Sequence, residues 1–282
     1  MKIKSSTMDK VFVTCNTIFL VLFVTITLYP VLNTLALSFN DGIDAVRGGI
    51  HLWPRIFTLS NYKTVLNQQN IITGAVVSVA RTVLGTIFSL VTNALLAYVI
   101  SRKRFLFRSQ LSLFWVITMY VNGGMIPTLL LYRNMNLTNS YAGLIMVYAG
   151  SSGLGYLICK GFFDTVPVAL REAAKLDGAS EARIFFQIVI PMSRPILVYT
   201  IISSFLTPWT DFVVAKMILN SGVSSDWTVA IGLYNMLQKA LVNSYFSRFC
   251  AGGVLVAIPI SILFVIMQKF YVEGITSGAA KG

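Results

Sequence analysis

The residues with the clearest chemical pattern lie in a polar segment, 164–195, between two apolar runs. Ala169, Glu172, Ala173 and Leu176 recur at the spacing of one helix face, so small and apolar side chains surround a single carboxylate. Small side chains let the groove of a partner protein approach the helix backbone closely, and the carboxylate can pair with a basic residue there. The pattern therefore predicts docking rather than catalysis.

Another face of this helix is mostly basic, because Val168, Arg171 and Lys175 share it. An amphipathic helix with a basic face can instead lie on lipid headgroups. The alanines on the first face would anchor such a helix only weakly in lipid. Docking in a protein groove is therefore the favoured interpretation.

Local signals mark where this helix begins and ends. Asp164-Thr165 is a helix-start signal, and Gly178 is a stop signal. Ser180 then opens a second short helix, which is expected to end at Pro191. The segment therefore predicts a helix–glycine–helix unit.

Residues for catalysis or metal binding are scarce. His51 is the only histidine, which argues against His-cluster metal sites and weakens any Ser–His mechanism. Cys15, Cys159 and Cys250 are far apart and are expected to be small buried hydrophobic residues. The glycine-rich run 150–155 lacks the lysine of a phosphate-binding loop, and close helix packing explains it better. We therefore expect no catalytic residue, no metal site and no cofactor bound by this chain.

The elements that carry these residues must be mostly membrane-embedded. The 282-residue chain is 56% hydrophobic and only 11% charged, with a mean hydropathy of +0.75, which leaves too little polar surface for a soluble domain. Lys and Arg total 22 against 10 Asp and Glu, a formal charge of +12. That charge is not gathered into the patch that nucleic acid would need. The composition predicts an all-α, polytopic membrane protein.

Six runs are apolar and long enough to cross a bilayer, since a span needs about 20 mostly apolar residues. With the N-terminus inside, 14 Lys and Arg lie in inner segments and 7 in outer ones. This bias predicts that both termini and the 164–195 segment are cytoplasmic. The expected spans, in a single transmembrane domain of residues 1–282, are approximately 11–39, 71–100, 111–132, 141–163, 196–219 and 250–270.

The polar segment also carries two blocks at a characteristic spacing, Glu172-Ala173-Ala174-x-x-x-Gly178 and Ile188-x-Ile190-Pro191. Together they resemble the EAA motif of permease subunits of bacterial ATP-binding-cassette (ABC) importers, with Ile190 a conservative departure from the common Leu. The string Glu-Ala-Ala-Lys-Leu-Asp-Gly-Ala is similar to the carbohydrate-importer branch, and the whole chain resembles the inner permease of the maltose-transporter type. Residues 123–127 resemble a subgroup that handles complex or acidic oligosaccharides.

The resemblance implies a type I ABC importer permease fold in the bacterial cytoplasmic membrane. A second permease subunit, in a heterodimer, would complete the pathway. Two cytoplasmic ATPase subunits would bind ATP and Mg, and an extracellular solute-binding protein would deliver an oligosaccharide. The EAA helix would be the coupling helix that enters an ATPase groove. The residues carried over for that role are Glu172, Ala173, Ala174, Asp177, Gly178 and Ala179.

A few residues inside the spans could contact a solute. Asp211 is an acid within a span, so it could line the pathway, or it could pair with Arg81 or cap a helix broken by the preceding proline. The family often has Asn where this chain has Thr after Trp209. Trp209 and Tyr120 could face sugar rings, and Asn122 could hydrogen-bond to a sugar, although interfacial belts and helix packing also use such residues.

Other functions stay open on the sequence alone. A permease for a non-sugar solute would carry the same motif. A secondary transporter or channel would predict more intramembrane charges or inverted repeats, and neither is evident. An intramembrane enzyme would need a clustered nucleophile and base or a metal set.

Overall fold

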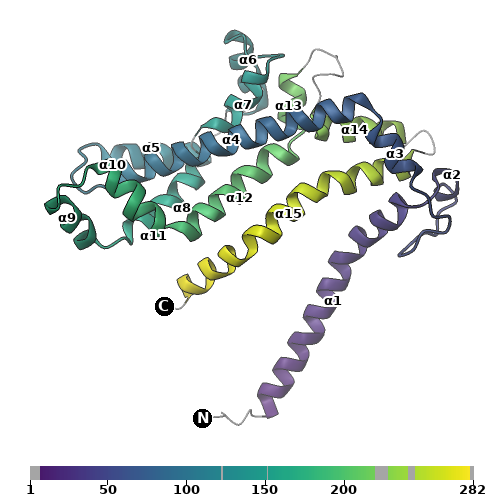
Figure 1. The fold of residues 1–282 in the computed structure, drawn as a ribbon, viewed down its shortest axis with the longest axis horizontal. Helices are drawn as coiled ribbons and strands as arrows, with labels where there is room; N and C mark the ends of the chain where they lie inside the picture. The colour runs from purple at the N-terminus through teal and green to yellow at the C-terminus, as the bar shows by residue number, and fades with distance from the viewer. Residues whose placement is uncertain (1–6, 122, 151, 220–227, 241–244, 280–282) are drawn as a thin grey trace. The chain divides into compact units, whose positions relative to one another are not determined.

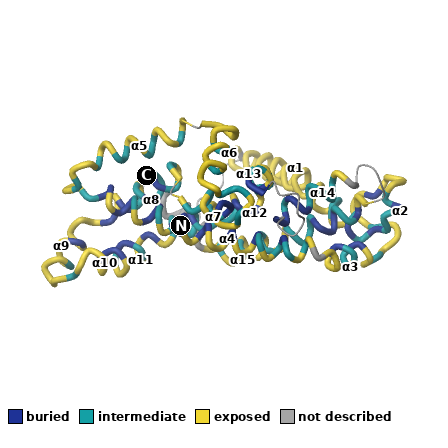
Figure 2. Tube along the Cα trace, turned by 90° about the horizontal axis from the view of Figure 1, so that it is seen from above, coloured by how far each residue is buried: buried dark blue, intermediate teal, exposed yellow. Residues whose placement is uncertain are grey.

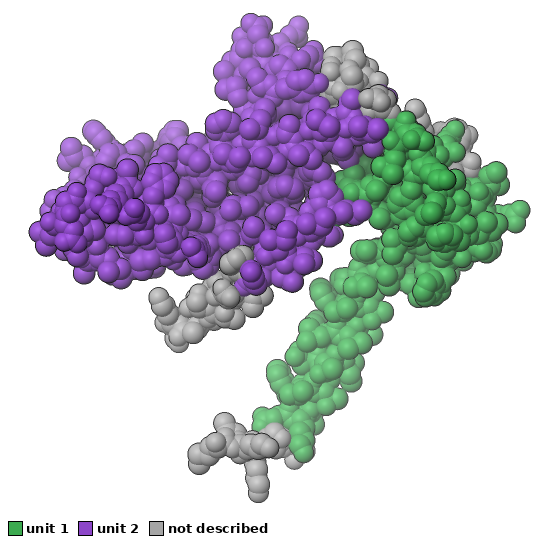
Figure 3. All heavy atoms as spheres, viewed as in Figure 1, with its two compact units in different colours: residues 1–68, 233–257 green, residues 69–232, 258–282 purple. Residues whose placement is uncertain are grey.

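The computed structural model describes residues 7–121, 123–150, 152–219, 228–240 and 245–279 (Figure 1). It contains two compact units, which Figure 3 distinguishes by colour. Unit 1 comprises residues 1–68 and 233–257, and unit 2 comprises residues 69–232 and 258–282. Apart from an isolated bridge between Asn40 and Phe57, the described residues contain no β-structure. The expected all-α class is confirmed.

Unit 1 begins with α1 (Thr7–Ser38), whose 32 residues extend about 48 Å at 1.5 Å per residue. Nearly all of α1 is exposed in the isolated chain (Figure 2), although its side chains are mostly apolar. A bare apolar helix of this length fits a lipid environment. The unit also holds α2 (Gly42–Ala45), α3 (Ser60–Leu66), most of α14 (Val229–Ala240) and the first part of α15 (Phe246–Ala279).

The polar stretch after α1 is built around buried polar side chains. The Asn40 side-chain oxygen accepts hydrogen bonds from the backbone N–H groups of Arg55 and Ile56, at 2.8 and 2.9 Å. Asp44 is 3% exposed and pairs with Arg55 at 3.4 Å. The Asn61 amide donates to the Ser38 carbonyl at 3.0 Å. This stretch is therefore an ordered structure of its own rather than a loose connection.

Unit 2 is organised around α4 (Gln69–Ser101), against which α7 (Tyr141–Ala149), α8 (Gly153–Asp164) and α12 (Arg194–Thr210) pack (Figure 1). The exposed face of α4 is aliphatic, and its buried face is small and polar. A soluble helix has the opposite arrangement, so α4 has the pattern of a helix that turns apolar side chains to lipid. The exposed face includes Val76, Val83, Ile87, Val91 and Leu95, and the buried face Ser78, Arg81, Thr82, Ser89 and Asn93.

Several of the expected spans are broken in the structure. The 111–132 span consists of α5 (Arg108–Tyr120) and α6 (Met125–Asn134), which differ in direction by 115°, and α7 and α8 of the 141–163 span differ by 41°. Gly124, at φ +86°, precedes α6, which explains the first break because this backbone conformation suits glycine. Ser152, the N-cap of α8, marks the second. By length and composition, the described helices provide three spans, or up to six if each bent pair is one span.

The remaining elements of unit 2 are short. Two elements were not expected from the sequence, α13 as a separate helix inside the 196–219 span in unit 2, and α14, most of which lies in unit 1. The sequence between residues 181 and 192 is helical throughout but includes one π-helical turn, η1. The bounds are α9 (Val168–Leu176), α10 (Glu181–Ile184), η1 (Phe185–Val189), α11 (Ile190–Met192) and α13 (Val213–Ile218).

The glycine-rich run at the start of α8 packs tightly, as the sequence predicts. A Cβ at Gly153 would overlap the Met119 side chain and lie 2.7 Å from the Trp115 carbonyl oxygen. A Cβ at Gly155 would lie 3.0 Å from the Asn93 side-chain oxygen. These glycines therefore let α8 approach α5 and α4 closely.

Gly153→Ala is expected to lower the midpoint of thermal unfolding of the purified chain, because overpacking against the Trp115 backbone costs roughly 1–3 kcal/mol. Gly161→Ala is the matched control, since a Cβ there meets nothing within 4 Å and alanine favours the helix. Equal midpoints for the two variants would contradict the packing described.

Candidate functional site

The helix–glycine–helix unit is present in unit 2. Gly178 follows α9 with φ +77°, a left-handed conformation that glycine adopts at little cost. The Ser180 side chain then accepts a hydrogen bond from the Arg183 backbone N–H at 3.2 Å and caps α10. The predicted stop at Gly178 and start at Ser180 are confirmed, and the second helix runs one residue past Pro191, to Met192.

The predicted start at Asp164-Thr165 is wrong. α8 continues to Asp164, whose carboxylate pairs with Lys160 one turn earlier at 2.6 Å. This pair at i, i+4 supports Asp164 as a helical residue. α9 instead begins after Pro167, because the fixed φ of proline suits the entry to a helix. No side chain caps this start with a hydrogen bond.

The stripe predicted to dock is open to the surroundings. Ala169, Glu172, Ala173 and Leu176 are all exposed, and Leu176 is 90% exposed. A leucine this exposed at the end of a nine-residue helix buries almost no apolar surface within the chain itself. The stripe is therefore accessible, as docking of a partner would require.

On the basic face of α9, Arg171 turns toward its own chain, whereas Val168 and Lys175 are exposed. Arg171 is only 9% exposed and donates to the Val166 carbonyl at 3.3 Å. Ala174 and Ala179 are half-buried against a hydrophobic core that includes Phe163 and Phe185. Of the six residues carried over for ATPase coupling, Glu172, Ala173, Asp177 and Gly178 are exposed, and Ala174 and Ala179 hold the unit to the core.

One carboxylate ties α9 and α10 to the end of α4. Glu181 pairs with Lys175 at 2.6 Å and with Arg102 at 3.0 Å, and it accepts a hydrogen bond from the Tyr98 hydroxyl at 2.7 Å. The Arg102 guanidinium lies over the Tyr98 ring, 3.9 Å from its centroid. The hydrogen bond from Lys175, followed by the charge of Arg102, holds the pKa of the Glu181 carboxyl below its ordinary value although partial burial opposes this. We refer to Tyr98, Arg102, Lys175 and Glu181 as the Glu181 cluster.

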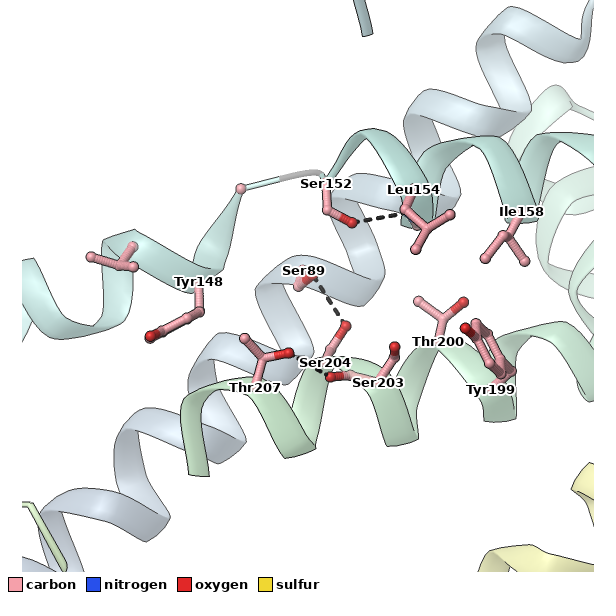
Figure 4. A pocket seen from close by; sticks show the side chains of 13 residues that line it. Ser89, Tyr148, Ser152, Leu154, Ile158, Tyr199, Thr200, Ser203, Ser204 and Thr207 are labelled. Carbon is pink, nitrogen blue, oxygen red and sulfur yellow. Dashed lines mark hydrogen bonds between the residues drawn. The ribbon is translucent and has the colours of Figure 1, made fainter. Parts of the chain in front are cut away.

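A cavity of about 230 Å³ lies among α4, α7, α8 and α12 (Figure 4). Eight of its thirteen lining residues carry a hydroxyl group, although the lining surface is more apolar than polar, and the Ser89 and Ser204 hydroxyls lie 3.3 Å apart. Sequence reasoning missed this site because its residues lie inside apolar runs. The available signal was the spacing of polar residues on α12 at i, i+3, i+4 and i+7. The hydroxyl-bearing residues are Ser89, Tyr148, Ser152, Tyr199, Thr200, Ser203, Ser204 and Thr207.

Asp211 makes both contacts that the structural interpretation of this residue requires. Its carboxylate accepts from the backbone N–H groups of Val214 and Ala215, each at 3.1 Å, and so caps α13. Arg81 is 2% exposed, and its guanidinium lies 3.9 Å from the Asp211 carboxylate. The same guanidinium donates to the Asp211 carbonyl at 2.8 Å and to the Pro208 carbonyl. Arg81 thus closes the break between α12 and α13.

The other residues expected to contact solute are not gathered into one site. Trp209 is 5% exposed, and its ring stacks on Phe205 at 5.8 Å between centroids. Tyr120 is 81% exposed at the end of α5, and Asn122 lies outside the described residues. Tyr120, Trp209 and Asp211 do not line the hydroxyl cavity. Within the described chain, no group of three His, Cys, Asp or Glu side chains could hold a metal ion.

Residues 82–277, which include the helix–glycine–helix unit and the hydroxyl cavity, match the sequence model of a family described as binding-protein-dependent transport system inner membrane component. The chain belongs to this family. This inner membrane component matches two relatives over nearly their whole length. The galactooligosaccharides transport system permease protein GanQ of Bacillus subtilis is 33% identical over 263 residues, 91% of each chain. The polygalacturonan/rhamnogalacturonan transport system permease protein YtcP of the same organism is 30% identical, covering 94% of this chain and 96% of the relative.

The fold of this inner membrane component is also that of a solved structure. A chain of a bacterial ABC transporter involved in the import of the acidic polysaccharide alginate superimposes with a TM-score of 0.86. The match covers 96% of this chain and 100% of the other, at 24% sequence identity. The resemblance to ABC importer permeases is thus confirmed at the level of family and fold.

Proposed function

We propose that this chain is the membrane-spanning subunit of an ATP-driven oligosaccharide importer, with six spans and both termini in the cytoplasm. Family membership and the oligosaccharide and polysaccharide relatives support this proposal. A second permease subunit completes the pathway, and a solute-binding protein delivers the sugar from outside. The chain is a transport subunit, and ATP and Mg bind to two separate ATPase subunits.

The exposed stripe of α9 is the observation that carries the coupling role. Small side chains at positions 169 and 173 leave the helix backbone accessible, and Glu172 supplies the only charge on the stripe. The Glu181 cluster holds the helix against α4, so a displacement of α9 by the ATPase is transmitted to the spans. Motion of this kind is the two-state switch that alternating access requires.

The hydroxyl cavity supports an oligosaccharide as solute. Ser and Thr hydroxyls both donate and accept hydrogen bonds, which matches the hydroxyl groups of a sugar. The cavity carries no full charge, so it offers weak, replaceable contacts that suit passage. We keep Tyr120, Trp209, Asn122 and Asp211 as candidate sugar contacts of the pathway. The contacts of Asp211 with Arg81 and α13 favour a structural role for that residue.

Glu172→Arg tests the coupling role. Reversing the charge on the stripe is expected to weaken docking of the ATPase roughly 30-fold, because a mismatched charge in a desolvated contact costs at least about 2 kcal/mol. The measurement is co-purification of the ATPase with the tagged chain from its own membranes, together with solute uptake.

Asp164→Arg is the matched control for this experiment. It reverses an exposed carboxylate close to the stripe, and it loses only the pair with Lys160. Undiminished co-purification and uptake with Glu172→Arg would remove the coupling assignment.

A further inference from the structure

The connection between α4 and α5 carries a second cavity, and two of its cations, Lys103 and Arg108, also line a neighbouring cavity together with Glu172 and Glu181. Its volume is about 390 Å³. Three cations line it, Lys103, Arg108 and Lys160, together with the hydroxyls of Ser109 and Ser112. Ser112 already accepts a hydrogen bond from Tyr156 at 2.9 Å, so it is held in place.

The positive charge of this cavity is only partly neutralised. Lys160 pairs with Asp164 at 2.6 Å, whereas Lys103 and Arg108 form no ion pair within the described chain. Moreover, α5 begins at Arg108, and no side chain caps it. The backbone N–H groups of its first turn point toward the start of the helix, next to this cavity. Two such cations, a serine hydroxyl and open amide donors make a site for a phosphate group.

Apolar side chains stand between the cations. Leu106 is 88% exposed and Phe107 is 61% exposed, and both lie in the connection between the end of α4 at Ser101 and the start of α5 at Arg108. A site for free phosphate would not need apolar side chains that are this exposed. The combination of basic residues with bare apolar ones is that of a surface that meets headgroups and acyl chains together.

We propose that this cavity binds the phosphate of an anionic phospholipid in the cytoplasmic leaflet, with Leu106 and Phe107 inserted among the acyl chains. The choice of leaflet rests on the proposed function. The connection lies on the same side of unit 2 as α9, because the neighbouring Arg102 pairs with Glu181. A bound lipid therefore lies next to the Glu181 cluster and steadies the end of α4.

The test uses the whole importer complex and phosphatidylglycerol as the probe. Native mass spectrometry counts the phosphatidylglycerol molecules retained in detergent. Lys103→Ala with Arg108→Ala is expected to weaken retention about 30-fold, since each surface cation contributes roughly fivefold. The matched control is Lys63→Ala with Arg133→Ala, which removes two exposed cations elsewhere and should leave retention unchanged.

A second variant, Leu106→Ser with Phe107→Ser, keeps every charge and is also expected to lower retention. If this variant retains lipid normally while inorganic phosphate competes with it, the site binds free anions and the lipid assignment is overturned. Equal retention by the Lys103/Arg108 variant and its control would also overturn it. ATPase co-purification of the Leu106→Ser with Phe107→Ser variant reports on the proposed function separately, because neither residue lines the cavity that Lys103 and Arg108 share with Glu172.

Discussion

Arg81→Met is expected to remove most of the folded chain from the membrane. The guanidinium is 2% exposed, and it holds two carbonyl groups and one carboxylate at the break between α12 and α13. Methionine fills a similar volume but leaves the largely buried Asp211 carboxylate without its cation. Breaking a buried pair in this way costs about 3–5 kcal/mol. The measurements are the yield of monodisperse protein and its midpoint of thermal unfolding.

The double variant Arg81→Met with Asp211→Asn distinguishes the lost pair from lost packing. It leaves no charge unpaired, and the amide oxygen of the substituted side chain can still cap α13, so it should recover part of the yield. Asp211→Asn alone should then be milder than Arg81→Met. Normal yield with altered transport for Asp211→Asn would instead make Asp211 a contact of the solute.

Glu181→Arg is expected to uncouple the ATPase while the spans stay folded. The new cation would face Lys175 and Arg102, which now share one carboxylate at 2.6 and 3.0 Å. Repulsion would release α9 from the end of α4, although the core beneath it remains. Solute-stimulated ATP hydrolysis in proteoliposomes should fall at least tenfold, with little change in the unfolding midpoint of the isolated chain.

Glu181→Gln is the graded control, because its amide oxygen can still accept from the Tyr98 hydroxyl and from one cation. We expect its activity to fall between those of the native chain and the arginine variant. Coupling that survives Glu181→Arg would show that α9 is held by its alanines alone.

The helix–glycine–helix unit could be read from the sequence because its signals are local. Gly178 and Ser180 act on backbone groups within a few residues, so their effect does not depend on the rest of the fold. The prediction at Asp164 was wrong because two local signals compete there, and the pairing with Lys160 prevails over the capping signal. The composition was enough to place the fold class and the apolar runs.

The Glu181 cluster could not be predicted in this way. Its partner Arg102 lies 79 positions earlier in the chain, and only the packing of α10 on α4 brings the two together. The buried setting of Arg171 likewise depends on the core beneath α9. The hydroxyl cavity requires four helices to converge, and its serines and threonines look like ordinary helix residues one at a time.

The long helix α4 connects the contacts of Arg81 with the Glu181 cluster. It carries Arg81 about a third of the way along and Tyr98 near its C-terminal end, and its 33 residues, about 50 Å of backbone, contain no proline. The neighbouring elements, in contrast, are interrupted between α5 and α6, α7 and α8, and α12 and α13. A continuous helix is stiff, and interrupted ones bend at their breaks. If an ATPase moves α9 as proposed, α4 therefore moves as one rigid element whose two ends shift together, while the broken helices around it bend at their interruptions.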